Sequence, residues 1–146
     1  MSDTMPADIL LVEDNKGDVR LLQEAFKDGK IVVNLHVVGD GVEALAFLHR
    51  EGKHKDAPRP DMILLDLNLP KKDGREVLSE VKNDVKLKRI PIVVLTTSSS
   101  GEDILRSYDA YANCYITKPV DMDQFVSVIK SLENFWLTLV KLPKQD

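Results

Sequence analysis

A single carboxylate interrupts the most constraining stretch of the chain, residues 61–74, which reads DMILLDLNLPKKDG. Residues 62–65 form an unbroken apolar run, as in a strand that is buried on both faces of a sheet. Asp66 follows where another Leu or Val is expected, and a buried carboxylate is costly unless it is paired, hydrogen-bonded or bound to metal. Because Pro70 cannot continue a central strand, the strand must end near Asp66. We therefore expect Asp66 at a strand's carboxyl end, where open α/β sheets bind ligands, although capping of the next helix would give the same local pattern.

Length and charge exclude several classes of protein. A chain of 146 residues is expected to form one domain. The net charge is −4, and the densest basic segment, residues 82–89, also contains Asp84 and is typical of a solvated face, so nucleic-acid binding is not expected. Cys114 is the only cysteine, which fits a reducing cytosol. No signal peptide is recognised and no apolar run approaches the ~20 residues of a membrane span, so we expect a cytoplasmic protein without a membrane partner.

Apolar runs and amphipathic segments alternate along the chain. Five strands are expected at residues 9–12, 31–38, 62–65, 90–95 and 114–117. Helices are expected at residues 16–28, 42–50, 75–83 and 102–112 and from 121 onward, with Val42, Leu45 and Leu48 facing inward in the second. This alternation predicts an α/β fold with a doubly wound, five-stranded parallel sheet and helices on both faces. It leaves no room for a second domain.

Polar side chains stand at the ends of the predicted buried strands. Glu13 and Asp14 follow the first, Asp66 the third, Thr96 the fourth and Lys118 the fifth. Three crowded carboxylates repel one another, and Mg²⁺ would relieve the repulsion because it prefers carboxylates, waters and a phosphate as ligands. The Thr96 hydroxyl and Lys118 could then donate to phosphate oxygens, so the set supports attack by a carboxylate on phosphorus. Separately, each residue has a plainer reading as a helix cap, a turn residue or a surface lysine.

The layout of these residues resembles that of response-regulator receiver domains, and the resemblance covers residues 7–139. It implies a flavodoxin-like sheet in strand order 2-1-3-4-5 and a phosphoryl group accepted on Asp66 from a sensor histidine kinase. It also implies a site for Mg²⁺, or alternatively Mn²⁺, and a switch that responds to the phosphate. The implied metal ligands are Glu13, Asp14, Asp66 and the main-chain carbonyl of Asn68. The implied phosphate-binding and switch positions are Thr96, its neighbour Thr97, Lys118 and Tyr115. The resemblance also implies a cis peptide bond before Pro119.

A narrower resemblance is to the stand-alone receivers of bacterial phytochrome-type histidine kinases. It is carried by the stretches DLNLPKKDGREVL, RIPIVVLTTS, NCYITK and FWLTLVKLP. The implied function is that of a two-component phosphorelay protein that signals through a protein surface. No enzymatic activity is implied beyond phosphorylation from phosphohistidine and slow autodephosphorylation.

Two other functions are compatible with parts of the pattern. A phosphatase of the haloacid dehalogenase type also uses a strand-end Asp with Mg²⁺. The pattern of that family has a second Asp, the general acid, at the position where this chain has Asn68. Asn68 cannot act as a general acid. A phosphorylation-independent binding module could keep the fold and lose the switch. The intact set of Glu13, Asp14, Asp66, Thr96 and Lys118 disfavours that second alternative.

The last predicted helix carries more apolar residues than a compact sheet needs for cover. Its pattern continues beyond Leu132 into a second group of large side chains. Such a surplus at the end of a chain is typical of a partner surface, and Trp and Phe are enriched in interface cores. We therefore expect a homodimer, unless the helix folds back and buries Trp136 in its own domain. The candidate interface residues are Phe135, Trp136, Leu137 and Leu139.

Overall fold

The computed structural model describes residues 7–27, 33–96 and 114–117, with the backbone alone at residues 96, 114, 115 and 117. The helices expected at 102–112 and from 121 onward lie outside these residues. So do the candidate dimer residues.

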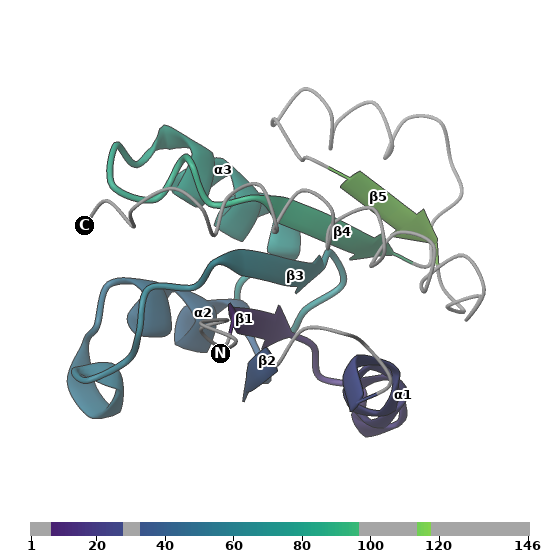
Figure 1. Cartoon of the computed structure of the whole chain (residues 1–146). Helices are drawn as coiled ribbons and strands as arrows, with labels where there is room; N and C mark the ends of the chain where they lie inside the picture. Colours follow the sequence, from purple (N-terminus) through teal and green to yellow (C-terminus); the bar gives the residue numbers. More distant parts are fainter. Residues whose placement is uncertain (1–6, 28–32, 97–113, 118–146) are drawn as a thin grey trace, which may run out of the picture.

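A five-stranded parallel sheet forms the centre of the molecule (Figure 1). Its strands lie in the order β2-β1-β3-β4-β5, as predicted for a flavodoxin-like fold. Every neighbouring pair is parallel, so the carboxyl ends of all the strands lie at one edge of the sheet. The strands are β1 (Ala7–Val12), β2 (Val33–Val38), β3 (Met62–Asp66), β4 (Ile92–Thr96) and β5 (Cys114–Thr117).

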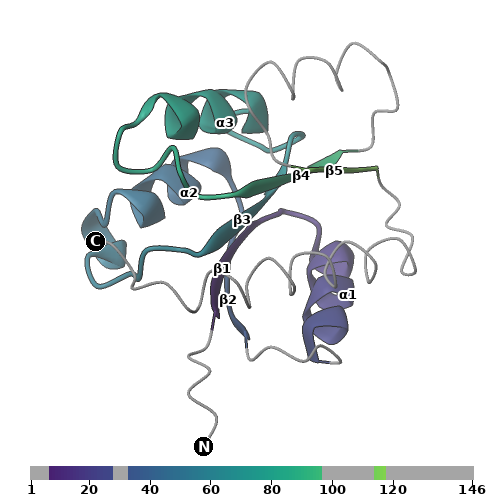
Figure 2. The same ribbon diagram turned by 45° about the horizontal axis from the view of Figure 1, so that its top comes forward.

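Alternation along the strands divides the core into two layers. Leu10, Ile63 and Leu65 belong to the layer that α2 (Gly41–Leu48) and α3 (Gly74–Asn83) cover. Ile9 and Leu64 belong to the opposite layer, which includes Leu22 of α1 (Lys16–Lys27). Figure 2 shows α2 and α3 on one face of the sheet and α1 on the other. Successive strand residues point to opposite faces, so a run that is apolar throughout needs cover on both.

The second helix differs from the prediction. It spans Gly41–Leu48, and Val42, expected to face inward, is 53% exposed. Ala44 and Phe47 lie in the core with Leu45, because the packed face of the helix is set by the direction from which the sheet approaches it. The residues that follow form a short 3₁₀ helix, η1 (Gly52–His54), within the expected loop.

The fourth strand and the basic segment after α3 also differ from expectation. β4 begins at Ile92 rather than at residue 90, because the Ile90 amide closes a turn onto the Leu87 carbonyl at 3.0 Å. Lys82 is not part of a fully solvated face. Its ammonium donates to the carbonyls of Lys88 and Ile90 at 3.1 and 3.0 Å, and desolvation by burial lowers its pKa.

Among the described residues, no helix is both long and apolar enough to cross a bilayer.

Candidate functional site

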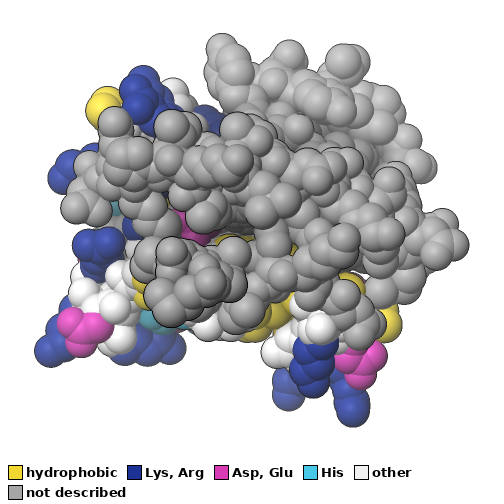
Figure 3. Space-filling view, in the orientation of Figure 1, with side chains coloured by type: hydrophobic (Ala, Val, Ile, Leu, Met, Phe, Trp, Pro, Cys, Tyr) yellow, Lys and Arg dark blue, Asp and Glu magenta, His cyan; other side chains and the backbone are white. Residues whose placement is uncertain are grey.

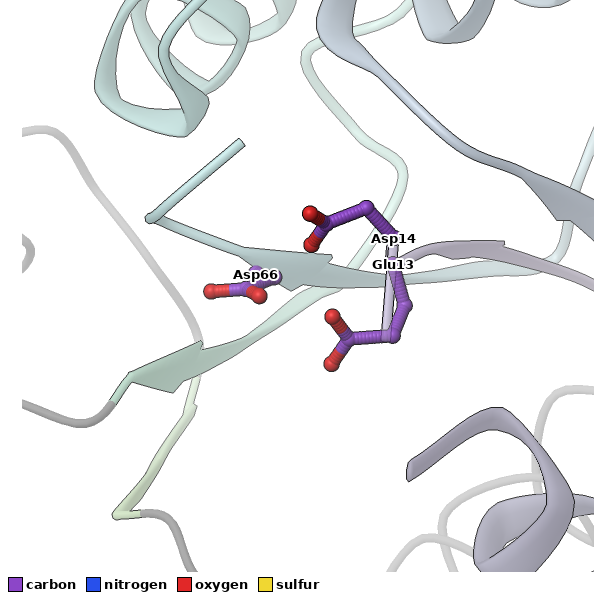
Figure 4. Close-up of side chains that lie close together, drawn as sticks. All are labelled: Glu13, Asp14 and Asp66. Carbon is purple, nitrogen blue, oxygen red and sulfur yellow. The ribbon is translucent and has the colours of Figure 1, made fainter. Parts of the chain in front are cut away.

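Three carboxylates converge at the edge of the sheet where the strands end (Figure 4). Val12 pairs with Leu65, so the residues that follow, Glu13 and Asp66, leave neighbouring strands at the same level. One oxygen each from Glu13, Asp14 and Asp66 lies within 4.8 Å of the other two. Glu13 and Asp66 are only 2% and 3% exposed, whereas Asp14 is exposed. The arrangement predicted from the strand ends is therefore present for all three carboxylates.

Backbone groups orient the two buried carboxylates. The Asn68 amide donates to Asp66 Oδ1 at 2.8 Å, and the Asn15 amide donates to Glu13 Oε2 at 3.3 Å. Hydrogen bonds from backbone N–H groups stabilise a carboxylate in its charged form. Among the described residues, every buried polar side-chain atom has a hydrogen-bond partner. The Asp66 carboxylate is thus held in a fixed orientation at the end of a buried strand.

Two glycines hold the connection from β3 to α3 next to Asp66. A Cβ on Gly74 would lie 2.2 Å from the Asp66 carbonyl oxygen and 2.6 Å from the Leu67 Cα. A Cβ on Gly41, the first residue of α2, would lie 2.2 Å from the Lys72 carbonyl oxygen. Real Cβ atoms do not approach other atoms so closely. The first residues of α2 and α3 can therefore pack against the connection from β3 to α3 only because both are glycines.

Aspartates begin both of these helices. Asp40 Oδ1 accepts from the Glu43 amide at 2.8 Å, and Asp73 Oδ1 accepts from the Arg75 amide at 2.7 Å. Asp40 also pairs with Lys71 across 3.5 Å, and Lys71 has a left-handed backbone with φ of 65°. These capping and packing roles were not predicted from the sequence. The signal that could have found them is an Asp-Gly pair directly before an amphipathic segment.

The structure places part of the predicted switch. Thr96 is the last residue of β4 and pairs with Thr117 of β5, and Tyr115 pairs with Val94. Only the backbone is described at Thr96 and Tyr115. Thr97, Lys118 and Pro119 lie outside the described residues. The strand positions put Thr96 at the same edge of the sheet as Asp66, since the Leu67 amide donates to the Leu95 carbonyl at 3.0 Å.

The donor set determines the chemistry that this site can support. In the described ranges of the chain, the candidate ligand atoms of this cluster are all carboxylate oxygens, with no nitrogen or sulfur. Such a set suits a hard divalent cation such as Mg²⁺. The exposed Asp14 leaves one side of the cluster open to solvent and to a ligand. A divalent cation would also offset the repulsion among three anions. A buried, oriented carboxylate beside such a cation can act as a nucleophile toward phosphorus.

Comparison with known families identifies the arrangement. Residues 9–130 match the response regulator receiver domain. The chain belongs to the response regulator receiver family. The phosphorelay function predicted from the sequence is confirmed at the level of the family.

The relatives of this receiver include response regulators of phytochromes. It is 51% identical over 138 residues to response regulator Rcp1 of Synechocystis sp., a match that covers 94% of each chain. The crystal structure of the phosphorylated cyanobacterial phytochrome response regulator RcpA is 53% identical, with a TM-score of 0.83, over 96% of this chain and 100% of that one. The Mn²⁺-bound form of Rcp1 is 50% identical, with a TM-score of 0.82, over 95% and 100% of the two chains. The narrower resemblance to phytochrome-type regulators is therefore confirmed.

Proposed function

We propose that this receiver accepts a phosphoryl group on Asp66 from the phosphohistidine of a sensor histidine kinase. The observation that carries the proposal is the position of Asp66 at the end of β3. Its carboxylate is buried, and one of its oxygens lies within 4.8 Å of a carboxylate oxygen of Glu13 and of Asp14. One Asp66 oxygen attacks phosphorus as the bond from phosphorus to the imidazole nitrogen breaks. The other ring nitrogen carries a proton, so the imidazole leaves in its neutral form. The Asn68 amide, 2.8 Å from Oδ1, holds the carboxylate in orientation during this step.

Glu13, Asp14, Asp66 and the Asn68 carbonyl are the proposed ligands of Mg²⁺, with Mn²⁺ as an alternative. The convergence of the three carboxylates supports this, as does the Mn²⁺-bound form of Rcp1. When bound, the cation neutralises charge that develops on the phosphoryl oxygens. The phosphoryl oxygens are also proposed to accept hydrogen bonds from the Thr96 hydroxyl and the Lys118 ammonium. Thr97 is proposed to belong to the same phosphate-binding and switch group. The peptide bond between Lys118 and Pro119 is proposed to be cis. Phosphorylation would then move Thr96 and Tyr115 together and alter a protein-binding surface.

The proposed kinase is a phytochrome-type histidine kinase in the cytoplasm. Support comes from the 51% identity to Rcp1 and the 53% identity to the phytochrome response regulator RcpA. Phosphotransfer profiling against a panel of kinases tests the assignment. Preferential transfer from kinases of another class would contradict it.

The phosphoacceptor is tested with acetyl phosphate and Mg²⁺, followed by mass spectrometry. Wild-type protein is expected to gain the mass of one phosphoryl group, and Asp66→Asn none. Asp56→Asn, at an exposed aspartate of the connection from α2 to β3, is the matched control and should behave as the wild type. A gain of mass that persists in Asp66→Asn would refute the assignment.

We also propose a homodimer, based on the apolar surplus at Phe135, Trp136, Leu137 and Leu139. Light scattering on the wild type and on a Phe135→Ala, Trp136→Ala double variant tests it. A dimer is expected for the wild type and a monomer for the variant. A wild-type monomer at high concentration, with and without phosphorylation, would exclude the dimer.

A further inference from the structure

Two basic connections meet at the edge of the sheet opposite the carboxylates. Residues 50–59 lead from α2 to β3, and residues 84–89 lead from α3 to β4. Because β3 and β4 are neighbours, the starts of both strands lie side by side. Arg59 joins the two connections directly, since its Nη2 donates to the Lys86 carbonyl at 3.0 Å. We call residues 50–59 and 84–89 together the basic patch.

The basic patch has a charge opposite to that of the rest of the chain. Seven cations and three carboxylates give it a net charge of +4. The whole chain carries −4, so the residues outside the patch carry −8. Figure 3 shows Lys and Arg side chains along the left border of the molecule, on the side where β3 and β4 begin in Figure 1. The cations of the patch are Arg50, Lys53, Lys55, Arg59, Lys86, Lys88 and Arg89, and its carboxylates are Glu51, Asp56 and Asp84.

Among the residues that the structure describes, most of these cations have no carboxylate partner. Lys53 pairs with Glu43 across 3.4 Å, but within the described part of the chain no ion pair involves the other cations of the patch. Those of them that are exposed are Arg50, Lys55, Lys86, Lys88 and Arg89. Their charge is therefore available to an external anion, in contrast to Lys71 and Lys72 near the site, which pair with Asp40 and Glu80.

The patch also presents an apolar side chain on an ordered support. Val85 is 79% exposed, the highest value among the large exposed hydrophobic residues of the described chain. Hydrogen bonds order the connection from α3 to β4 that carries Val85. Lys82 Nζ donates to the Lys88 and Ile90 carbonyls, and the Lys86 amide donates to Asp84 Oδ1 at 2.8 Å. A pre-ordered surface loses little conformational entropy when a partner binds.

We propose that the basic patch is a docking surface for an acidic segment of a partner protein that carries an apolar residue for Val85. A peptide can touch the patch alone, within the Debye length of about 8 Å at physiological salt. A bilayer or a nucleic-acid duplex is larger than the patch, so the net charge of −8 on the residues outside the patch repels it more strongly than it repels a short peptide. The charge distribution therefore favours a protein segment over the other polyanions.

Docking there leaves the phosphorylation site free. The patch and Asp66 lie at opposite ends of β3, where four steps of about 3.3 Å separate the first and last Cα atoms by roughly 13 Å. A partner bound at the patch neither covers the carboxylates nor needs them. Phosphorylation by acetyl phosphate is thus expected to proceed at an unchanged rate with the patch occupied.

The probe is a fluorescein-labelled, Glu-rich peptide with one central Leu, used in anisotropy titrations of the full chain; its Gln-rich counterpart is the control peptide. The Glu peptide is expected to bind, with affinity that weakens as salt is raised, and the Gln peptide is not. Lys86→Glu with Arg89→Glu should weaken binding at least about tenfold, since two attractions become repulsions. Arg20→Glu with Lys27→Glu, an equal change in net charge on exposed positions of α1, should leave binding close to wild type.

A third variant separates the apolar contact from the charges. Val85→Ser is expected to weaken binding about two- to fivefold at unchanged net charge. If both charge-reversal pairs weakened binding of the Glu peptide equally, binding would depend on net charge alone, and this result would overturn the proposal. So would the absence of binding by the Glu peptide, or its binding with no loss in the patch variant. Binding of the wild type to vesicles with anionic lipids, without binding to the Glu peptide, would assign the patch to a membrane instead.

Discussion

At the scale of single residues, the position of Asp66 depends on a residue that has no side chain. The Gly74 amide donates to the Leu67 carbonyl at 3.1 Å, and its Cα faces the Asp66 carbonyl in a space that a methyl group cannot enter. The start of α3 therefore lies directly against the backbone of the proposed phosphoacceptor. A displacement at residue 74 must move Asp66, move the helix, or both.

Gly74→Ala is expected to slow phosphorylation of Asp66 by about 10- to 100-fold, because a misplacement of ~1 Å can cost that much in rate. It should also lower the free energy of unfolding by about 1–3 kcal/mol, typical of overpacking. Phosphorylation kinetics with acetyl phosphate and urea unfolding measure the two effects.

Gly39→Ala is the matched control for that substitution. A Cβ there meets nothing within 4 Å, and the backbone of Gly39 is not in the left-handed region. Kinetics and stability close to wild type are expected. An equal slowing in both variants would show that Gly74 has no particular role in placing Asp66.

At the scale of elements, the start of α2 joins the connection from β3 to α3. Asp40 caps the helix through the Glu43 amide and pairs with Lys71, while Gly41 packs on the Lys72 carbonyl. The hydrogen bond from the Glu43 amide is the main cause that holds the pKa of Asp40 below its usual value of 3.8, with Lys71 acting in the same direction. The helix and the site-bearing connection are thus stabilised by one carboxylate.

Asp40→Ala is expected to lower the free energy of unfolding by about 1 kcal/mol at neutral pH, the usual cost of losing an N-cap. Asp40→Asn keeps an acceptor but loses the charge. Because the folded-state pKa of Asp40 is lowered, its charged form adds stability above pH 3.8, and this is lost as the pH falls through the lower folded pKa.

Urea unfolding at neutral and at acid pH measures this dependence. The difference between wild type and Asp40→Asn should shrink as the pH falls, and Asp56→Ala, which removes an exposed carboxylate, should show no comparable loss at neutral pH. A difference that grows in acid would contradict the assigned cause of the pKa shift.

A second pH-dependent contact joins the first turn of α2 to η1. His54 Nε2 lies 2.6 Å from Glu43 Oε2, and the His54 ring packs on Phe47 with centroids 5.5 Å apart. Phe47 also contacts His36 of β2, whose Nε2 lies 3.1 Å from Asp8 Oδ1. Hydrogen bonding to His54 is the main cause that lowers the pKa of Glu43. These contacts connect α2, β2 and η1 around one aromatic ring.

At the scale of the whole molecule, the carboxylate cluster is expected to lower stability when no cation is bound. Glu13 and Asp66 are removed from water beside Asp14, and like charges at this range repel one another. A ligand that binds only the folded state raises stability by RT ln(1 + [L]/Kd). The site therefore couples metal binding to the stability of the entire domain.

Mg²⁺ at ten times its dissociation constant is expected to stabilise the wild type by about 1.4 kcal/mol and raise its melting temperature by a few degrees. Asp14→Asn should melt at a higher temperature than the wild type without metal, since repulsion is reduced, and should respond weakly to Mg²⁺. Differential scanning calorimetry with and without Mg²⁺ measures both. An identical Mg²⁺ response in wild type and Asp14→Asn would remove Asp14 from the proposed ligands.

Sequence patterns alone predicted the buried strands, their parallel arrangement and the three carboxylates that meet at their ends. Residues 9–12 and 62–65 are apolar throughout, which is typical of a strand covered on both faces, and an acid directly after such a run is expected at the edge of the sheet. The resemblance to receivers supplied the order of the strands. These features are local or repeat with a fixed period, so the linear sequence contains them.

Tertiary structure alone decided the contacts between segments that are distant in the chain. The exposure of Val42, the contact of Gly41 with Lys72, the support of the 84–91 connection by Lys82 and the meeting of the two basic connections at Arg59 all depend on how helices dock on the sheet. No periodicity within a helix records which neighbour will approach it or how closely. The proposed phosphoacceptor was therefore predictable from its own strand, whereas the glycine that positions it became recognisable only once α3 was seen against the backbone of Asp66.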